Sequence, residues 1–320
     1  MTPGTAVSAR RPLAPTGEQI ELVSGDQRVV VVEVGGGIRS YTIGDEELLD
    51  AYGPDEMAAS GRGQVLIPWP NRLSGGTYEF DGQRHQVPLN EPELGNAIHG
   101  LVRWDAWSIA EREPQRVVMQ HTLHPRPGYP FSLAVRIEYT LSGDGLAVRT
   151  TATNMGARAC PFGSGAHPWL LAMPGTDDRA TLRIPANVVL RVDERGIPTG
   201  EIPVAGTELD FRVPRPIGTT RIDHAFVDLA RDDDGLARVT FRGQRGRLIT
   251  VWFDASYPVV QLSSGDVLPD VDRHSLAIEP MTCPPNAFQT GEALVRLEPG
   301  DAFTGTWGIT PTIEIRGGTA

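Results

Sequence analysis

The chain has 320 residues, of which 40% are hydrophobic and 22% charged, and it contains 36 glycines and 27 prolines. This composition is typical of a soluble protein rich in turns and argues against a mostly helical one. The net charge of -11 argues against nucleic acid as a partner, and the 29 basic residues are all arginine, which excludes a lysine Schiff base, a pyridoxal phosphate linkage and a P-loop lysine.

Proline and glycine interrupt the N-terminal segment, so we expect residues 1–17 to form a disordered tail. The chain lacks the run of about 18 apolar residues that a membrane-spanning helix needs. Its two cysteines, Cys160 and Cys283, lie far apart and outside any metal-binding spacing, which favours free thiols in a reducing compartment. We therefore expect a cytoplasmic protein without a membrane partner, in which residues 18–320 form one domain.

Short runs with the period of a β-strand dominate the chain. In residues 131–141, large apolar side chains occupy the odd positions and mostly polar ones the even positions. A Ser-Gly-Asp-Gly turn leads to a second alternating run, residues 146–153, so the pair predicts a hairpin. Similar runs occur at 28–34, 38–43, 117–123, 180–184, 188–192, 237–242, 248–253, 259–262, 275–278 and 302–309. Only residues 45–52 and 291–297 fit a short helical turn.

Many short strands without intervening helices predict an all-β fold, a large antiparallel sandwich of two sheets. The three glycines at 35–37 lie between two predicted strands, which indicates a hairpin turn rather than a phosphate-binding loop. The acidic residues at 232–234 also lie between two strands, and they lack the downstream ligand of a calcium loop. We expect a solvated turn there.

Histidine spacing gives no metal site. His121 and His124 lie three residues apart in a predicted strand, so their side chains point to opposite faces. No HExxH helix and no GxSxG nucleophile motif is present. The spacing therefore argues against a zinc site, and the missing motif gives little support for nucleophilic catalysis.

Four segments place a polar residue in an apolar or Gly/Pro-rich context, where burial is costly unless the residue is paired or functional. They are residues 70–73, 97–100, 165–169 and 276–280. Glu279 is consistent with a structural glutamate paired with an arginine or with a catalytic one. His99 and His167, each taken alone, are more often core or turn histidines. The combination favours a functional site.

At these segments the sequence resembles the aldose 1-epimerase, or galactose mutarotase, family. The resemblance rests on residues 71–82, 89–90 and 99–100, on His167-Pro168-Trp169, on residues 223–226, and on residues 279–280 and 285–288. It extends in order over about residues 20–310. It implies a catalytic domain built as a large antiparallel β-sandwich, whose open concave face binds a monosaccharide without a metal ion or an organic cofactor.

The resemblance also implies the roles of individual residues. It makes Glu279 the general base and His167 the general acid that open and close the sugar ring. The implied substrate-binding residues are Asn71, Arg72, His99 and Asp223. Trp104 and Trp107 follow the His99 segment, and either ring is consistent with an apolar wall for the sugar or with core packing.

Two features depart from the family pattern. Trp169 stands where tyrosine or phenylalanine is common, and the stretch from His99 to Arg103 resembles hexose-6-phosphate epimerases, whose arginines bind phosphate. The Phe-Arg-Gly-Gly stretch of that branch is absent at 65–72, which favours a free aldose. A non-catalytic sugar-binding protein and a glycosidase using Asp223 with Glu279 remain as alternatives. The preferred aldose and the oligomeric state stay open.

Overall fold

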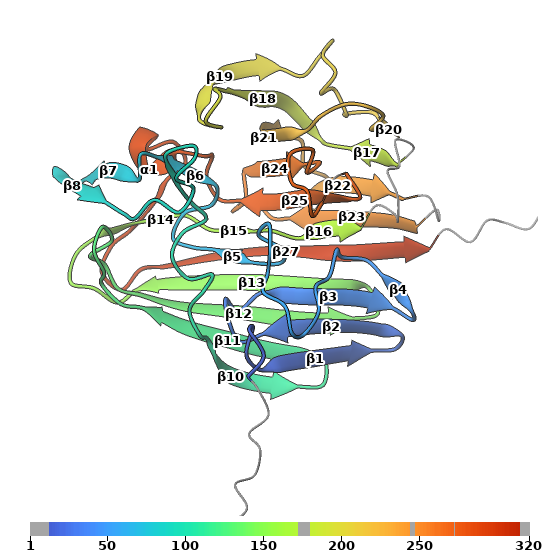
Figure 1. Ribbon diagram of the computed structural model, residues 1–320, viewed down its shortest axis with the longest axis horizontal. Helices are drawn as coiled ribbons and strands as arrows, with labels where there is room; N and C mark the ends of the chain where they lie inside the picture. Colours follow the sequence, from blue (N-terminus) through green and yellow to red (C-terminus); the bar gives the residue numbers. More distant parts are fainter. Residues whose placement is uncertain (1–12, 172–179, 244–246, 272, 314–320) are drawn as a thin grey trace, which may run out of the picture.

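The computed structural model describes residues 13–171, 180–243, 247–271 and 273–313. These residues form two layers of antiparallel β-sheet (Figure 1). One layer is a nine-stranded sheet. In spatial order its strands are β10 (Ser108–Glu113), β11 (Arg116–Leu123), β12 (Leu133–Ser142), β13 (Gly145–Asn154), β27 (Ala302–Ile313), β23 (Arg247–Phe253), β22 (Ala237–Arg242), β17 (Thr181–Arg183) and β20 (Arg215–Pro216).

The other layer consists of an eight-stranded and a four-stranded sheet (Figure 1). The strands of the larger are β19 (Pro198–Pro203), β18 (Ala186–Val192), β21 (Asp223–Leu229), β24 (Val259–Ser263), β25 (Ser275–Met281), β15 (Gly165–Ala166) and β5 (Val65–Leu66), and β16 (Trp169–Leu171) also pairs with β25. The strands of the smaller are β1 (Gln19–Ser24), β2 (Gln27–Val32), β3 (Ile38–Ile43) and β4 (Glu46–Glu47).

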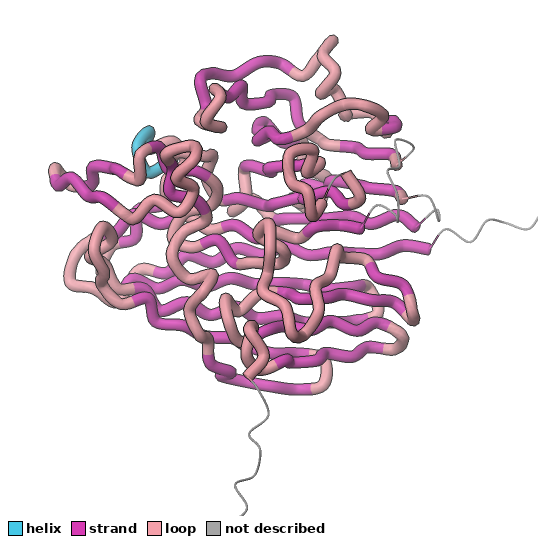
Figure 2. Tube along the Cα trace, viewed as in Figure 1, coloured by secondary structure: helices cyan, strands magenta, loops and turns pink. Residues whose placement is uncertain are grey.

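Three two-stranded sheets and a short helix complete the fold. The paired strands are β6 (Arg72–Ser74) with β9 (Asn96–Ile98), β7 (Thr77–Phe80) with β8 (Gln83–Gln86), and β14 (Cys160–Phe162) with β26 (Val295–Leu297). Within the described residues the helix, α1 (Ala287–Thr290), spans four residues, and strands and loops make up the rest (Figure 2).

The strand periodicity correctly located the best-defined hairpin. β12 and β13 pair in an unbroken antiparallel register from Leu133–Asn154 to Ser142–Gly145. Buried side chains recur at every second position of β12. One hydrophobic cluster joins side chains from all three larger sheets, such as Leu22, Ile137 and Ile278. Alternating strand faces therefore supply a core shared by the two layers.

The turns were predicted correctly and the helices were not. Residues 35–37 connect the paired strands β2 and β3, and residues 232–235 form the turn before β22. Residues 46–47 instead form β4, because Gly44 makes a tight turn that folds them back onto β3. Residues 295–297 form β26, since Gly291 ends α1 in a left-handed conformation.

Most of the predicted N-terminal tail, residues 1–17, lies outside the described residues. Near its end Thr16 is buried, and its carbonyl accepts a hydrogen bond from the Val34 backbone N–H. Both cysteines are buried and free. No helix in the described ranges reaches the length and hydrophobicity of a membrane-spanning segment.

Candidate active site

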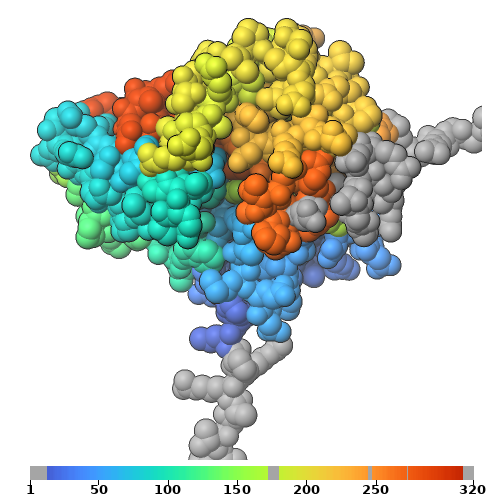
Figure 3. Space-filling model, turned by 45° about the horizontal axis from the view of Figure 1, so that its top comes forward, coloured from blue at the N-terminus to red at the C-terminus, as the bar shows by residue number. Residues whose placement is uncertain are grey.

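The candidate residues meet beside the eight-stranded sheet. Glu279 lies on β25, His167 follows the adjacent strand β15, and His99 follows β9. One ligating atom from each of these three residues lies within 4.8 Å of the others, and all three side chains are buried. On the surface, the teal, yellow and orange segments of the chain converge on one face of the molecule (Figure 3).

His167 and Glu279 form the central pair. His167 Nε2 lies 3.4 Å from Glu279 Oε1. The backbone holds His167 in place, because its N–H donates to the Gln64 carbonyl at 3.1 Å and its carbonyl accepts from Gly63 N–H at 2.9 Å. His167 Nδ1 and Glu279 Oε2 are buried and have no hydrogen-bond partner in the described part of the chain. The pair therefore retains polar atoms for a ligand.

The His167 ring lies between an aromatic side chain and a glycine. Its ring stacks on Trp169 with centroids 5.5 Å apart, and Trp169 Nε1 donates to the Ser60 carbonyl at 2.8 Å. On another side, Gly61 has a φ of +74°, and a Cβ added there would come within 2.6 Å of His167 Cδ2. Only glycine satisfies both the backbone conformation and the available space.

Two hydrogen bonds connect His99 and Asn71, one in each direction. Both have left-handed backbone conformations, with φ of 63° and 52°. The Asn71 N–H donates to His99 Nδ1 at 3.2 Å, and the His99 N–H donates to the Asn71 carbonyl at 2.9 Å. Because Nδ1 of His99 is an acceptor, the neutral ring carries its proton on Nε2. The His99 and His167 rings meet edge to face with centroids 5.1 Å apart.

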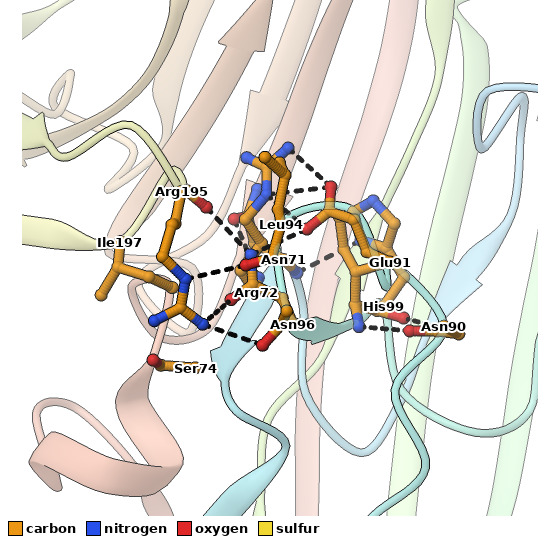
Figure 4. Close-up of polar contacts among 12 residues, drawn as sticks. Asn71, Arg72, Ser74, Asn90, Glu91, Leu94, Asn96, His99, Arg195 and Ile197 are labelled. Atoms are coloured by element: carbon orange, nitrogen blue, oxygen red, sulfur yellow. Dashed lines mark hydrogen bonds and ion pairs between the residues drawn. The ribbon is translucent and has the colours of Figure 1, made fainter.

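Arg72 is held by a network that also fixes the loop between β18 and β19 (Figure 4). Glu91 accepts hydrogen bonds from Arg72 Nε and Nη2, each at 3.0 Å. Asn96 donates to Glu91 and to the Arg195 carbonyl, both at 2.9 Å. Arg195 in turn donates to the carbonyls of Leu94 and Gly95 at 2.8 Å. Arg72 Nη1 has no such partner among the described residues and remains for a ligand.

Asp223 is connected to the central pair through a residue that the sequence analysis missed. Gln261 on β24 is the register partner of Glu279 on β25, and its amide donates to Asp223 Oδ1 at 2.8 Å. The sequence did indicate Gln261, because it is a polar residue in a mostly apolar strand, as are the polar residues of the four segments singled out above. Glu91 was also missed, because a glutamate in a polar loop carries no such signal.

Burial controls the proton affinities of the site. It raises the pKa of Glu279 well above its usual range, and the charge of Asp223 adds to that shift. Burial lowers the pKa of His167 to about 3 and that of His99 well below its usual range. A general base and a general acid need a Glu279 carboxylate and a His167 imidazolium, and this charged pair is not the resting form, because desolvation outweighs mutual attraction. The shared proton favours the Glu279 carboxyl group.

Asp223 is exposed to solvent, but the protein atoms around its carboxyl group raise its pKa by desolvation, while the charge of Arg72 lowers it.

The two tryptophans considered as an apolar wall for the sugar have different environments in the structure. Trp104 is 45% exposed and lies beside the Arg103 guanidinium, whereas Trp107 is buried in the core against the His121 ring. Trp107 therefore has the packing role.

The cluster of His99, His167 and Glu279 also has the donor set of a metal site, which the histidine spacing did not reveal. Two imidazoles and a carboxylate suit a transition metal ion. His121, which the sequence analysis considered for metal, instead lies 3.2 Å from the Asp105 carboxylate.

A sequence model of the aldose 1-epimerase family matches residues 18–310. The chain belongs to the aldose 1-epimerase family. A relative of this chain, the uncharacterized protein YihR of Escherichia coli K12, is 37% identical over 287 residues, which cover 89% of this chain and 90% of that protein. Human galactose mutarotase is 28% identical over 269 residues, which cover 76% and 77%.

Family membership agrees with the architecture. The structure of the GalM/aldose epimerase homologue from C. elegans superimposes with a TM-score of 0.81 at 18% identity, covering 92% of this chain and 98% of that chain. At this identity the similarity concerns the fold alone. It confirms the predicted large antiparallel β-sandwich of the aldose 1-epimerase family.

Proposed function

We propose that the protein is an aldose 1-epimerase that interconverts the α and β anomers of an aldose through the His167–Glu279 pair. The observation that supports this most directly is the 3.4 Å approach of the two side chains in a buried site. The matching family and the human relative named galactose mutarotase support the same reaction. Asn71, Arg72, His99 and Asp223 are the proposed ligands of the sugar oxygens.

The reaction needs one proton acceptor and one proton donor. In the reactive form the proton of the pair lies on His167, and the nearby charge of Arg72 favours the Glu279 carboxylate. Glu279 removes the proton of the anomeric hydroxyl, the electrons of that O–H bond form the C1 carbonyl, and the C1–O5 bond breaks. His167 gives its proton to O5.

Ring closure restores the starting state. After rotation about the C1–C2 bond, His167 takes the proton back from the O5 hydroxyl, and O5 attacks the other face of C1. The carbonyl oxygen then receives the proton from Glu279. No net proton is exchanged with solvent, which suits a pair this deeply buried.

Polarimetry tests the proposal. We expect freshly dissolved α-glucose or α-galactose, or an aldose that the site prefers, to reach its equilibrium rotation faster with the protein than in buffer alone. Binding of the sugar without acceleration would indicate a sugar-binding protein. Release of the chromophore from a chromogenic glycoside would indicate a glycosidase that uses Asp223 with Glu279.

A further inference from the structure

Residues 59–64 form a turn that contacts His167 and the ring stacked on it. The Gly63 N–H donates to the His167 carbonyl at 2.9 Å, and the Ser60 carbonyl accepts a hydrogen bond from Trp169 Nε1 at 2.8 Å. The Trp169 ring in turn stacks on the His167 imidazole. The backbone of His167 and the ring that packs against its side chain therefore both depend on where this turn lies.

The backbone of the 59–64 turn lies outside the sheets. Ser60 and Gly63 have left-handed conformations, with φ of 50° and 64°, and the strand β5 begins only at Val65. A serine rarely adopts this conformation, and it does so where the surrounding structure imposes it. Contacts with other segments must therefore hold the turn in place.

Arg62 supplies such contacts from within the turn. It is buried, and its guanidinium donates to Asp50 Oδ2 at 2.9 Å and to Asp270 Oδ2 at 2.5 Å. The Asp270 carbonyl also accepts from Arg62 Nη2, and the Asp270 carboxylate accepts from the Ser60 hydroxyl, both at 2.9 Å. A planar guanidinium that binds two carboxylates fixes direction as well as distance. The turn is thus attached to two segments that are distant in the chain.

Asp50 extends this network to the strand that carries Glu279. Its carboxylate accepts a hydrogen bond at 2.8 Å from the hydroxyl of Ser275, the first residue of β25. Its backbone N–H donates to the Trp169 carbonyl at 2.9 Å. Arg62 and Asp50 therefore connect the turn at the proposed acid with the strand of the proposed base.

We propose that Arg62 is a positioning residue: its two ion pairs hold the 59–64 turn against His167 and keep this acid aligned with Glu279. The inference rests on the proposed function, since it concerns the same acid–base pair. Apolar side chains could fill the same buried volume without loss of stability. They could not supply the directed bonds that fix the turn.

Polarimetry and titration calorimetry with the whole chain test the inference, with glucose and galactose as probes. Arg62→Met keeps much of the side-chain volume and removes both ion pairs. We expect kcat to fall about 10- to 100-fold, because a displacement of the acid by about 1 Å has an effect of this size, while the dissociation constant of the sugar changes less than about threefold. In a His167→Asn background the same change should lower kcat less than about threefold, since the residue through which Arg62 acts is absent.

Three further variants complete the design, and circular dichroism shows whether each is folded. Arg62→Lys keeps a cation that can reach one carboxylate, so it should retain more activity than Arg62→Met. Asp270→Asn breaks one ion pair at a partly exposed carboxylate and should lower kcat in the same direction. Arg116→Met removes an arginine that also pairs with two carboxylates, those of Glu111 and Glu138 on the nine-stranded sheet, and should leave kcat unchanged. If Arg62→Met does not fold, Asp270→Asn takes its place in every comparison.

The inference is overturned if folded Arg62→Met keeps the wild-type kcat, or if it lowers kcat as much in the His167→Asn background as in the wild type. Either result leaves the proposed function intact. If the wild type does not accelerate mutarotation, the proposed function is wrong, and nitrogen NMR of the histidine side chains decides the inference. Shifted His167 signals in Arg62→Met, with those of His121 unchanged, support the positioning role, and unchanged His167 signals reject it.

Discussion

The facing atoms of His167 and Glu279 are 3.4 Å apart, and the second polar atom of each side chain is buried without a partner among the described residues. A purely structural pair would normally satisfy these atoms with protein donors or acceptors. Here His167 Nδ1 and Glu279 Oε2 remain free to form hydrogen bonds, while the other polar atoms of the two side chains share a proton. This arrangement suits a pair that exchanges protons with a ligand.

Replacing Glu279 by Gln should lower turnover by about 10²–10⁴-fold, because the amide keeps the shape but cannot take the anomeric proton. The sugar should still bind in calorimetry. His167→Asn should lower turnover similarly, and the double variant should be little worse than either single one, since the two groups act as a unit. Glu201→Gln, on the exposed strand β19, is the matched control. Wild-type mutarotation by Glu279→Gln would reject the mechanism.

The pH profile should follow the proton of the pair. Below about 3, the lowered pKa of His167, the pair gains a second proton and lacks an acceptor. Above the raised pKa of Glu279, the pair loses its only proton and lacks a donor. We expect kcat/KM, measured by polarimetry and corrected for the spontaneous rate, to remain high well below the ordinary imidazole range and to fall on the alkaline side. An acidic limb near the usual histidine pKa would contradict this assignment.

Replacing Arg72 by Lys should weaken sugar binding about 10-fold and affect kcat less, because an ammonium cannot bind Glu91 through two atoms while presenting a third to the sugar. Calorimetry and the KM measure this effect. Glu91→Gln should also raise the KM, because the amide holds the Arg72 guanidinium in place less firmly than the carboxylate does. An unchanged KM in Arg72→Lys would remove Arg72 from the binding site.

Treatment with EDTA should leave activity unchanged, since the proposed acid–base pair supplies both proton transfers. Added Zn²⁺ should instead inhibit, because His167 and Glu279, two members of the cluster that has the donor set of a metal site, would lose their lone pairs to the ion. Inhibition should be relieved by EDTA and by high sugar concentration. Loss of activity in EDTA that a specific divalent ion restores would show a catalytic metal.

Sequence periodicity located many of the strands, because each sheet buries one face, but it missed others such as β1, β10 and β21. The hairpin of β12 and β13 is the clearest example, with alternating burial along β12 as predicted. The helical expectations at 45–52 and 291–297 were wrong, because glycines at positive φ redirect the chain into strands. Residues 46–47 fold back onto the preceding strand β3, and residues 295–297 pair with the distant strand β14. Short helices are decided by such tertiary contacts rather than by local preference.

The sequence predicted several residues of the candidate site but not the contacts between residues distant in the chain. His99, His167 and Glu279 stood out as polar residues in apolar surroundings, and the structure brings them together. Gln261 became meaningful only when the register of β24 and β25 placed it opposite Glu279. The ion pairs of Arg62 also join segments that are far apart in the chain. Sequence pattern contains no information on pairings of this kind.

Gly61 and Trp169 both pack against the His167 ring before any sugar arrives. A side chain restricted by such contacts loses little rotational freedom when the substrate binds, so little binding energy is consumed in orienting the acid. The same confinement makes Gly61 sensitive to change, although it has no side chain and takes no part in the chemistry. A single methyl group there would displace the imidazole from Glu279 and uncouple proton transfer while leaving every reacting group present.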